Sequence, residues 1–176
     1  RLSILCRSVF IMKKLITKLE KKITSPKKFL PEDFFLFIGR MTPFANVDLL
    51  IKNNKNETLL TWRKKGEKYL PGWHLPGGII RFREKISKRI NNVAMNELNT
   101  KVKFTKKPIA VNEIHLNQIN RSHFISLLYL CKLTRPLNKK LKYISGNPKI
   151  NQWRWFKKSP KNLIPPHKIY KKFINK

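Results

Sequence analysis

The chain has 176 residues, and its 40 Lys and Arg against 9 Asp and Glu give it a formal net charge of +31. That length suits one compact domain with a hydrophobic core and argues against two. So large a positive charge favours polyanionic partners, namely nucleotides, nucleic acid or an anionic membrane surface. Compositional drift toward Lys, Asn and Ile would give the same charge without any ligand, and composition alone does not separate these two interpretations.

The cysteine content argues against folds held by disulfides or zinc. Cys6 and Cys131 lie far apart and form no Cys-x-x-Cys pair, so we expect neither a disulfide framework nor a structural zinc site. Free thiols are typical of a reducing environment, and we predict a cytoplasmic location. We also predict no membrane span, because no apolar run reaches the roughly 20 residues that a bilayer requires.

The N-terminal part of the chain is first apolar and then basic. The opening RLSILCRSVFI resembles a shortened signal peptide but lacks a small-residue cleavage site. Because Met12 resembles a start, we expect residues 1–11 to be an upstream or disordered extension. Residues 12–23 carry apolar side chains at helical spacing with lysines on the other faces, and Pro26 ends the run. This pattern predicts a basic amphipathic helix.

The predicted domain begins with a short helix at Pro31, where proline suits the first turn and two acidic residues follow it. We therefore separate residues 1–30, a basic N-terminal extension with its amphipathic helix, from a domain over residues 31–176. Residues 44–54 and 57–63 have the composition of two strands joined by the polar turn NNKNE. This arrangement predicts a β-hairpin.

A further helix is predicted over residues 85–99, since apolar residues recur along one stripe of it. The stripe consists of Ile86, Ile90, Val93, Ala94 and Leu98. The remaining predictions are strands over residues 101–116, 123–133 and 152–156, a long loop over residues 134–150 and a closing helix over residues 167–175. Elements that alternate in this way predict a mixed sheet flanked by helices.

The strongest motif is GWHLPGG, a Gly-Gly loop that leads into the predicted helix. Loop and helix together resemble those of the Nudix hydrolases, which place glutamates on one helical face to hold magnesium around a diphosphate. When the family pattern is laid on Gly78, its first Glu falls on Glu84 and the last Glu of the helix falls on Glu97. The positions that would converge with Glu97 on the metal are Val93 and Asn96, so one helix ligand remains acidic.

One Nudix subfamily, the GDP-mannose mannosyl hydrolases, departs from the family pattern in a similar way. The segment VAMNEL resembles its helix, and further segments match in order over residues 31–156. These segments are PEDFFLFIGRMTP, NVDLLI, LLTWR, GWHLPGG, SHFIS and WRWF. The resemblance implies a Nudix-type α/β/α sandwich with a mixed sheet and a hydrolase, and it offers a homodimer as one partner.

The resemblance also implies roles for individual residues. Magnesium would be bound by the Glu97 carboxylate and the Gly77 carbonyl, since this cation prefers oxygen ligands. Arg63 would hold the diphosphate of the leaving group, because a guanidinium can grip phosphate oxygens in two places. Asp48 would be an active-site aspartate that orients the sugar or the water, and His115 would be a substrate-binding residue.

The chain departs from the subfamily at four positions. The subfamily's glutamine metal ligand and its general-base histidine fall on Lys149 and Ile150, and an isoleucine cannot accept a proton. Ile79 stands where the subfamily has an arginine, and Phe124 stands where it has a tyrosine. Binding of a nucleotide is therefore easier to predict than turnover.

Each proposed site residue also has a purely structural interpretation. Asp48 lies in an apolar strand, where a carboxylate must be functional or paired with a neighbour. Arg63 is one of many basic residues and equally suits a solvated surface charge, whereas the structural alternative for Glu97 is a surface salt bridge. Glu84 equally suits a brace that holds the loop without touching metal.

We predict a magnesium-dependent hydrolase of a nucleotide sugar such as GDP-mannose, which releases the sugar and a nucleoside diphosphate. The alternative is a catalytically weak or inactive Nudix-fold domain that binds nucleotide or RNA through its basic surface. RNA binding would require exposed aromatics on one basic face, and the candidates are Trp153, Trp155 and Tyr170. His74 and His123 have no ligand cluster around them in the sequence, and we interpret them as core or strand residues.

Overall fold

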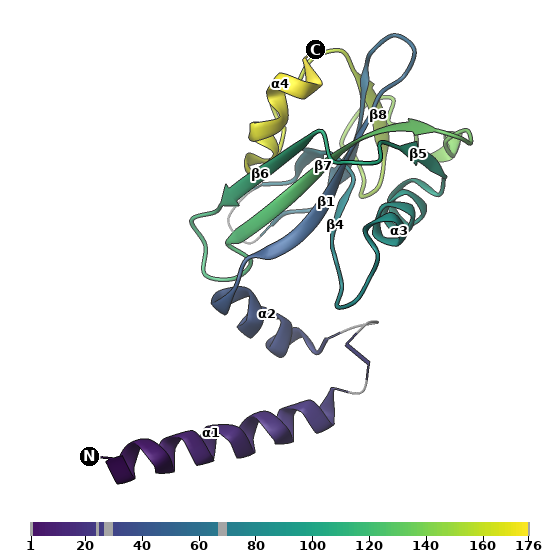
Figure 1. The fold of residues 1–176 in the computed structure, drawn as a ribbon. Coiled ribbons are helices and arrows are strands. Elements are labelled where there is room, and N and C mark those ends of the chain that lie inside the picture. Colours follow the sequence, from purple (N-terminus) through teal and green to yellow (C-terminus); the bar gives the residue numbers. More distant parts are fainter. Residues whose placement is uncertain (1, 24, 27–29, 67–69, 176) are drawn as a thin grey trace.

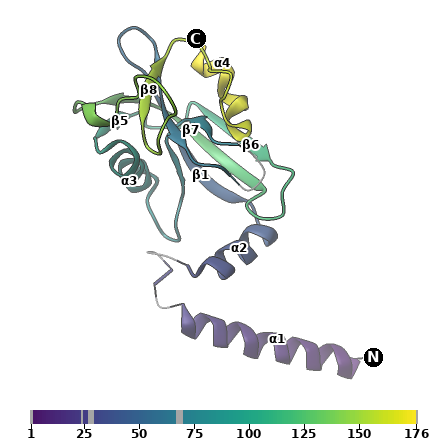
Figure 2. The same ribbon diagram turned by 180° about the vertical axis from the view of Figure 1, so that it is seen from behind.

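The computed structural model describes residues 2–23, 25, 26, 30–66 and 70–175, and only the backbone of residues 2–7. Its main sheet has five strands, and a smaller sheet has three. Figures 1 and 2 show helix α3 on one side of the main sheet and α4 on the other, so that the sheet lies between two helical layers. This arrangement confirms the predicted α/β/α sandwich with a mixed sheet.

Two helices precede the sheets. Helix α1 spans Leu2–Lys22, and helix α2 spans Glu32–Met41 with Pro31 at its N-cap, as predicted. The alternative of a disordered extension over residues 1–11 is wrong, because residues 2–11 have no proline or glycine and form part of α1. The other alternative, an upstream extension, stays a prediction. The described side chains of α1, residues 8–22, are all exposed, and Figure 1 shows α1 apart from the sheets. The division of the chain at residue 30 stays a prediction.

No helix within the described ranges combines the length and the apolar character needed to cross a membrane.

Strand β1 is an inner strand of the main sheet. It spans Phe44–Ile51 and pairs with β4 on one edge and with β7 on the other. The pairing with β4 is antiparallel and sets Asp48 opposite Gly77, whereas the pairing with β7 is parallel. The other strands of this sheet are β4 Gly77–Ile79, β5 Val102–Phe104, β6 Ala110–His115 and β7 His123–Leu133.

The predicted hairpin between the first two strands is wrong. Strand β2, Thr58–Arg63, lies in the smaller sheet between β3, Gly72–His74, and β8, Trp153–Phe156. A single bridge, Lys52 to Thr58, links the ends of β1 and β2. Because β4 and β7 already occupy both edges of β1, no hydrogen-bonding edge remains for β2, and the chain diverges into a second sheet.

Apolar side chains on both faces of β1 hold the helical layers. Val47, Leu49 and Ile51 pack in one core cluster with the stripe of α3, which spans Ile86–Leu98. Leu50 lies in a second cluster with Tyr170 of the 3-10 helix η2. The predicted stripe of α3 is confirmed from Ile90 onward, while Ile86 in the first turn is 37% exposed.

The other differences from the predicted elements are local. The predicted strand over residues 101–116 forms β5 and β6, and the turn between them contains Pro108, which has no N–H for a sheet. The predicted loop over residues 134–150 is interrupted by a short 3-10 helix, η1, Lys139–Leu141. The predicted closing helix consists of η2, Pro165–Tyr170, followed by the short helix α4, Lys171–Ile174.

Glu84 braces the loop before α3, in agreement with its structural interpretation. Its Oε2 accepts hydrogen bonds from the Arg81 backbone N–H at 3.0 Å and from Arg89 Nε at 2.8 Å, and its Oε1 accepts from Asn92. Burial by itself raises the pKa of Glu84, but these hydrogen bonds and the Arg89 charge outweigh it and hold the pKa below its ordinary value. The carboxylate therefore ties the loop to a buried arginine that the sequence did not single out.

We expect Glu84→Gln to lower the free energy of unfolding by about 2 kcal/mol at pH 7, because hydrogen bonds to a charged acceptor are lost. A carboxyl group whose pKa is depressed by folding contributes stability above its unfolded pKa, and this contribution disappears as the pH falls through the folded pKa. The difference from the unmodified protein should therefore shrink below the ordinary Glu pKa of 4.5. Urea unfolding at several pH values measures it, with the exposed Glu20→Gln as control. A difference that persists in acid would contradict this role.

Candidate active site

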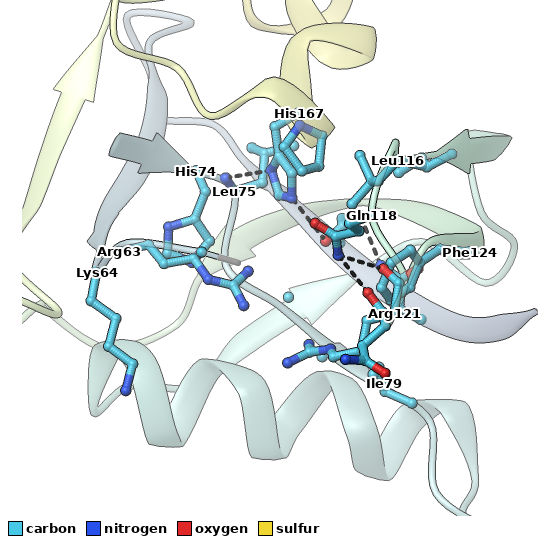
Figure 3. Close-up of a pocket in the computed structure, with 18 of the residues that line it drawn as sticks. Arg63, Lys64, His74, Leu75, Ile79, Leu116, Gln118, Arg121, Phe124 and His167 are labelled. Atoms are coloured by element: carbon cyan, nitrogen blue, oxygen red, sulfur yellow. Dashed lines mark hydrogen bonds and ion pairs between the residues drawn. The ribbon is translucent and has the colours of Figure 1, made fainter. Parts of the chain in front are cut away.

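A cleft of about 390 Å³ opens where the two sheets meet. Its walls come from α2, β1, the ends of β2 and β3, the Gly-Gly loop, the β6–β7 loop and η2. Figure 3 shows Arg63 and Lys64 on one side of this cleft and Gln118, Arg121 and Phe124 on the other. Residues that are far apart in the sequence therefore face one common space.

Asp48 is the buried acid of this cleft, with 2% of its surface exposed. Its Oδ2 accepts hydrogen bonds from the hydroxyls of Ser126 at 2.5 Å and Tyr170 at 2.6 Å, and from Asn46 Nδ2 at 3.0 Å. Burial raises the pKa of Asp48 above its ordinary value of 3.8, although the three hydrogen bonds and the charge of His74 act in the opposite direction. These donors fix one carboxylate oxygen in place.

The other oxygen, Asp48 Oδ1, accepts no hydrogen bond among the described residues and faces the Gly-Gly loop. A Cβ atom built on Gly77 would lie 2.1 Å from Oδ1, so only glycine permits this approach of β4 to β1. His167 Nε2 lies 3.9 Å from this Oδ1. Asp48 thus presents one constrained oxygen and one available oxygen.

His167, on η2, is buried and lines the same cleft. Its Nδ1 accepts a hydrogen bond from the Leu75 backbone N–H at 3.1 Å, so the proton of the neutral ring lies on Nε2, toward Asp48. Burial lowers the pKa of His167 well below its ordinary value of 6.5, and the charges of His74 and Arg63 lower it further. At neutral pH this imidazole is a neutral N–H donor.

Basic residues border the cleft on two sides. Arg63, Lys64 and Lys65 come from the end of β2, and Arg121 comes from the β6–β7 loop. That loop is tied to α2 by a hydrogen bond from Arg40 to Asn120 at 2.8 Å. A cleft with cationic walls attracts phosphate groups strongly.

Glu97 of α3 lies directly beside the Gly-Gly loop. Its Oε1 accepts a hydrogen bond from the Gly77 backbone N–H at 3.1 Å, and its Oε2 accepts one from the Thr61 hydroxyl at 3.1 Å. His74 Nε2 lies 3.2 Å from the same Oε2, while His74 Nδ1 lies 2.8 Å from the Thr61 carbonyl oxygen. Both ring nitrogens of His74 therefore face acceptors, and this ring links the Gly-Gly loop to Glu97.

The structure brings most of the predicted site residues together. Asp48, Arg63 and Gly77 line the cleft, and Glu97 contacts Gly77. His115 is not part of this cleft: it lies at the end of β6, its side chain is 66% exposed, and it pairs with Glu113. Its neighbours along the chain, Ile114 and Leu116, line the cleft instead, because alternate residues of a strand point to opposite faces.

The four residues at which the chain departs from the subfamily fall into two groups. Ile79 and Phe124 line the cleft. Lys149 and Ile150 lie in an exposed loop and contribute nothing to the described walls of the cleft. Among the described residues, His74 and His167 line the cleft. The sequence did not single out His167, because only the fold brings η2 beside Asp48.

The aromatic residues considered for RNA binding are mainly in the core. Trp153 is 5% exposed and Tyr170 is fully buried, and Trp155 packs against the core cluster. Buried rings cannot stack on bases. Trp153 and Tyr170 are therefore closed to stacking, and Trp155 is partly buried.

Comparison with known proteins identifies the fold. No protein-family model matches this sequence, and no curated protein matches it. Among solved structures, a MutT Nudix hydrolase from Burkholderia pseudomallei is 20% identical, with a TM-score of 0.54 over 76% of this chain and 98% of that one. An ADP-ribose pyrophosphatase from Streptococcus suis is 16% identical, with a TM-score of 0.52 over 76% of this chain and 87% of that one.

The chain has the Nudix fold. These two structures share this fold with the chain at low sequence identity, and they do not single out the GDP-mannose subfamily. The two glycines of the GWHLPGG motif begin strand β4, and the chain then continues into α3, as the motif predicted.

The Nudix fold implies a divalent cation between the Gly-Gly loop and α3, and the donors present test this expectation. Three protein donors already face the Glu97 carboxylate, which has roughly four lone-pair positions and so retains about one for a metal. The Gly77 carbonyl would be a second donor. Magnesium takes about six oxygen ligands and often completes them with water and substrate phosphates. The residues therefore fit a magnesium ion that is shared with a bound diphosphate.

Proposed function

We propose that the protein hydrolyses a nucleotide sugar such as GDP-mannose, and that it releases the sugar and a nucleoside diphosphate. The observation that carries this proposal is the buried carboxylate of Asp48, which lines a cleft with cationic walls and whose Oδ1 accepts no hydrogen bond among the described residues. A cleft of about 390 Å³ lies within the range of small-molecule sites. The coarser activity, hydrolysis of a nucleoside diphosphate derivative, agrees with the Nudix fold.

The diphosphate would lie between the two basic walls. Arg63 can hold two phosphate oxygens with its planar guanidinium, and Lys64 adds a point charge on the same side. Arg121 would contact the substrate from the opposite wall. These charges stabilise the negative charge that develops on the leaving diphosphate.

Asp48 would act as the general base. As water attacks the anomeric carbon, a new C–O bond forms, and a water proton moves to Asp48 Oδ1. The bond between the anomeric carbon and the diphosphate oxygen breaks, and its electron pair leaves with the nucleoside diphosphate. Ser126 and Tyr170 hold the carboxylate in position through Oδ2, while the neutral Nε2–H of His167 can donate a hydrogen bond to the water or to a sugar hydroxyl.

A bound magnesium ion would neutralise part of the diphosphate charge, with Glu97 and the Gly77 carbonyl as its protein ligands. The remaining steps depend on side chains of the chain itself.

The proposal is tested with a panel of nucleotide sugars, purified protein and magnesium, in water enriched in oxygen-18. We expect free sugar and nucleoside diphosphate as products, with the label in the sugar. A label in the phosphate, together with nucleoside monophosphate, would show attack at phosphorus and would contradict attack at carbon. Binding of the nucleotide without turnover of any panel member would favour the inactive binding domain instead.

We expect magnesium binding to depend on the nucleotide, since the protein supplies few ligands of its own. Isothermal titration should detect little binding of magnesium alone, whereas a nucleoside diphosphate should bind more tightly when magnesium is present. Glu97→Gln should remove this enhancement, because a neutral amide is a weaker oxygen donor. The exposed Glu32→Gln at the cleft entrance is the matched control. An unchanged enhancement in Glu97→Gln would exclude Glu97 as a ligand.

A further inference from the structure

A second group of metal-ligating side chains lies on the outer strand of the main sheet, away from the cleft. Glu113 and His115 are two residues apart on β6, so their side chains lie on the same face. The antiparallel register sets His115 directly opposite His123 of β7. Sheet geometry alone therefore brings one carboxylate and two imidazoles together.

The distances within this Glu113–His115–His123 cluster match those between the ligands of one metal ion. Glu113 Oε1 lies 3.0 Å from His115 Nε2 and 3.1 Å from His123 Nε2. One ligand atom from each of the three residues lies within 4.8 Å of the others. In a tetrahedral zinc site, bonds of about 2.0 to 2.1 Å place neighbouring ligand atoms about 3.3 Å apart. Small side-chain movements would seat such an ion.

A simple surface salt bridge explains this arrangement less well. Both imidazoles contact the same oxygen, Glu113 Oε1, and their rings stack with centroids 4.2 Å apart. Exposed ion pairs also contribute little to stability, so an ion pair alone does not account for two of the four histidines meeting at one acidic residue.

We propose that Glu113, His115 and His123 bind a divalent transition-metal ion, with zinc as the best fit. Two imidazoles and one carboxylate are ligands that suit zinc, nickel or cobalt, whereas magnesium prefers oxygen alone. The remaining coordination positions face solvent, because Glu113 and His115 are 60% and 66% exposed. This site is separate from the proposed magnesium position at Gly77 and Glu97.

The site has a defined relation to the cleft. Its ligands lie at the base of the β6–β7 loop, and that loop supplies cleft-lining residues, which are Leu116, Gln118, Asn120 and Arg121. A metal ion that joins β6 to β7 would fix the two ends of this loop relative to each other.

Zinc titration of the metal-free full chain tests the proposal. The protein carries Cys6→Ser so that this thiol cannot contribute, and Cys131 is buried. We expect one zinc ion per chain by isothermal titration, and the cobalt form should show the visible absorption of a tetrahedral nitrogen and oxygen site. Millimolar magnesium should not displace the zinc.

Single substitutions of the three proposed ligands test where zinc binds. Glu113→Gln, His115→Asn and His123→Asn should each weaken zinc binding at least about tenfold, because each removes one ligand. The control is Glu20→Gln on α1, which removes an exposed acid without histidine neighbours and should leave the affinity unchanged. The proposal is overturned if the parent protein takes up no zinc, or if all three ligand variants bind zinc as tightly as the parent.

Discussion

Asp48→Asn is expected to lower kcat by about a hundredfold to ten-thousandfold, the usual cost of losing a positioned general base. The amide is close to the carboxylate in size, and its oxygen can accept the hydrogen bonds from Ser126 and Tyr170. The protein should therefore stay folded and still bind nucleotide. Steady-state kinetics on the best nucleotide sugar measure the loss, with the exposed Asp33→Asn of α2 as control. Full activity in Asp48→Asn would exclude this residue as the base.

The pH dependence of the same variant provides a second test. Folding raises the pKa of Asp48 through burial, so its contribution to stability is fully present below the ordinary value of 3.8 and is lost as the pH rises through the folded pKa. At pH 7 the buried charge is a cost that the amide does not have. At pH 7 the free energy of unfolding of Asp48→Asn should therefore be at most about 1 kcal/mol lower than that of the parent. In the parent, kcat/KM should rise with pH as Asp48 loses its proton.

Gly77→Ala is expected to have the largest effect on stability, a loss of about 3 kcal/mol or more. The added Cβ would lie 2.1 Å from Asp48 Oδ1 and 3.0 Å from the Val47 carbonyl oxygen. Neither atom can move away easily, because hydrogen bonds hold the Asp48 carboxylate and β1 is paired with a strand on both edges. Urea unfolding measures the loss of stability, and activity should fall with it.

Two further variants control this measurement. At Gly78 an added Cβ would meet Val93 Cγ2 at 3.0 Å, and a side-chain methyl group can give way more readily, so Gly78→Ala should cost clearly less. The double variant Gly77→Ala with Asp48→Ala removes the clashing carboxylate and should be more stable than the sum of the single effects implies. Additive effects would show that Gly77 and Asp48 do not meet as described.

The local elements follow largely from the sequence. Apolar residues from Ile90 to Leu98 recur at helical spacing, and this period by itself determines that α3 is a helix with one buried face. Pro31 and the two acids after it fix the start of α2. Asp48 could be singled out because a charged residue within an apolar strand is costly unless it has a partner or a function.

The pairing of these elements was decided by the tertiary structure. Strands β1 and β2 are neighbours in the sequence, yet hydrogen-bond partners far along the chain, β7 and β8, draw them into different sheets. A turn signal such as NNKNE specifies only its own few residues. Which edges of a strand are occupied depends on the whole sheet, and this information is not local.

The site residues also divide into those that the sequence indicated and those that only the fold brings to the cleft. The resemblance selected Arg63, Gly77 and Glu97, which the structure places in or beside one cleft, and their roles stay predictions. It could not determine His167 or the Tyr170 hydroxyl, which reaches Asp48 across 122 residues. It also misassigned His115 to the pocket, although strand alternation and the register with His123 place it on the opposite face. Periodicity and spacing describe the neighbourhood along the chain, whereas register and packing decide which side chains meet in space.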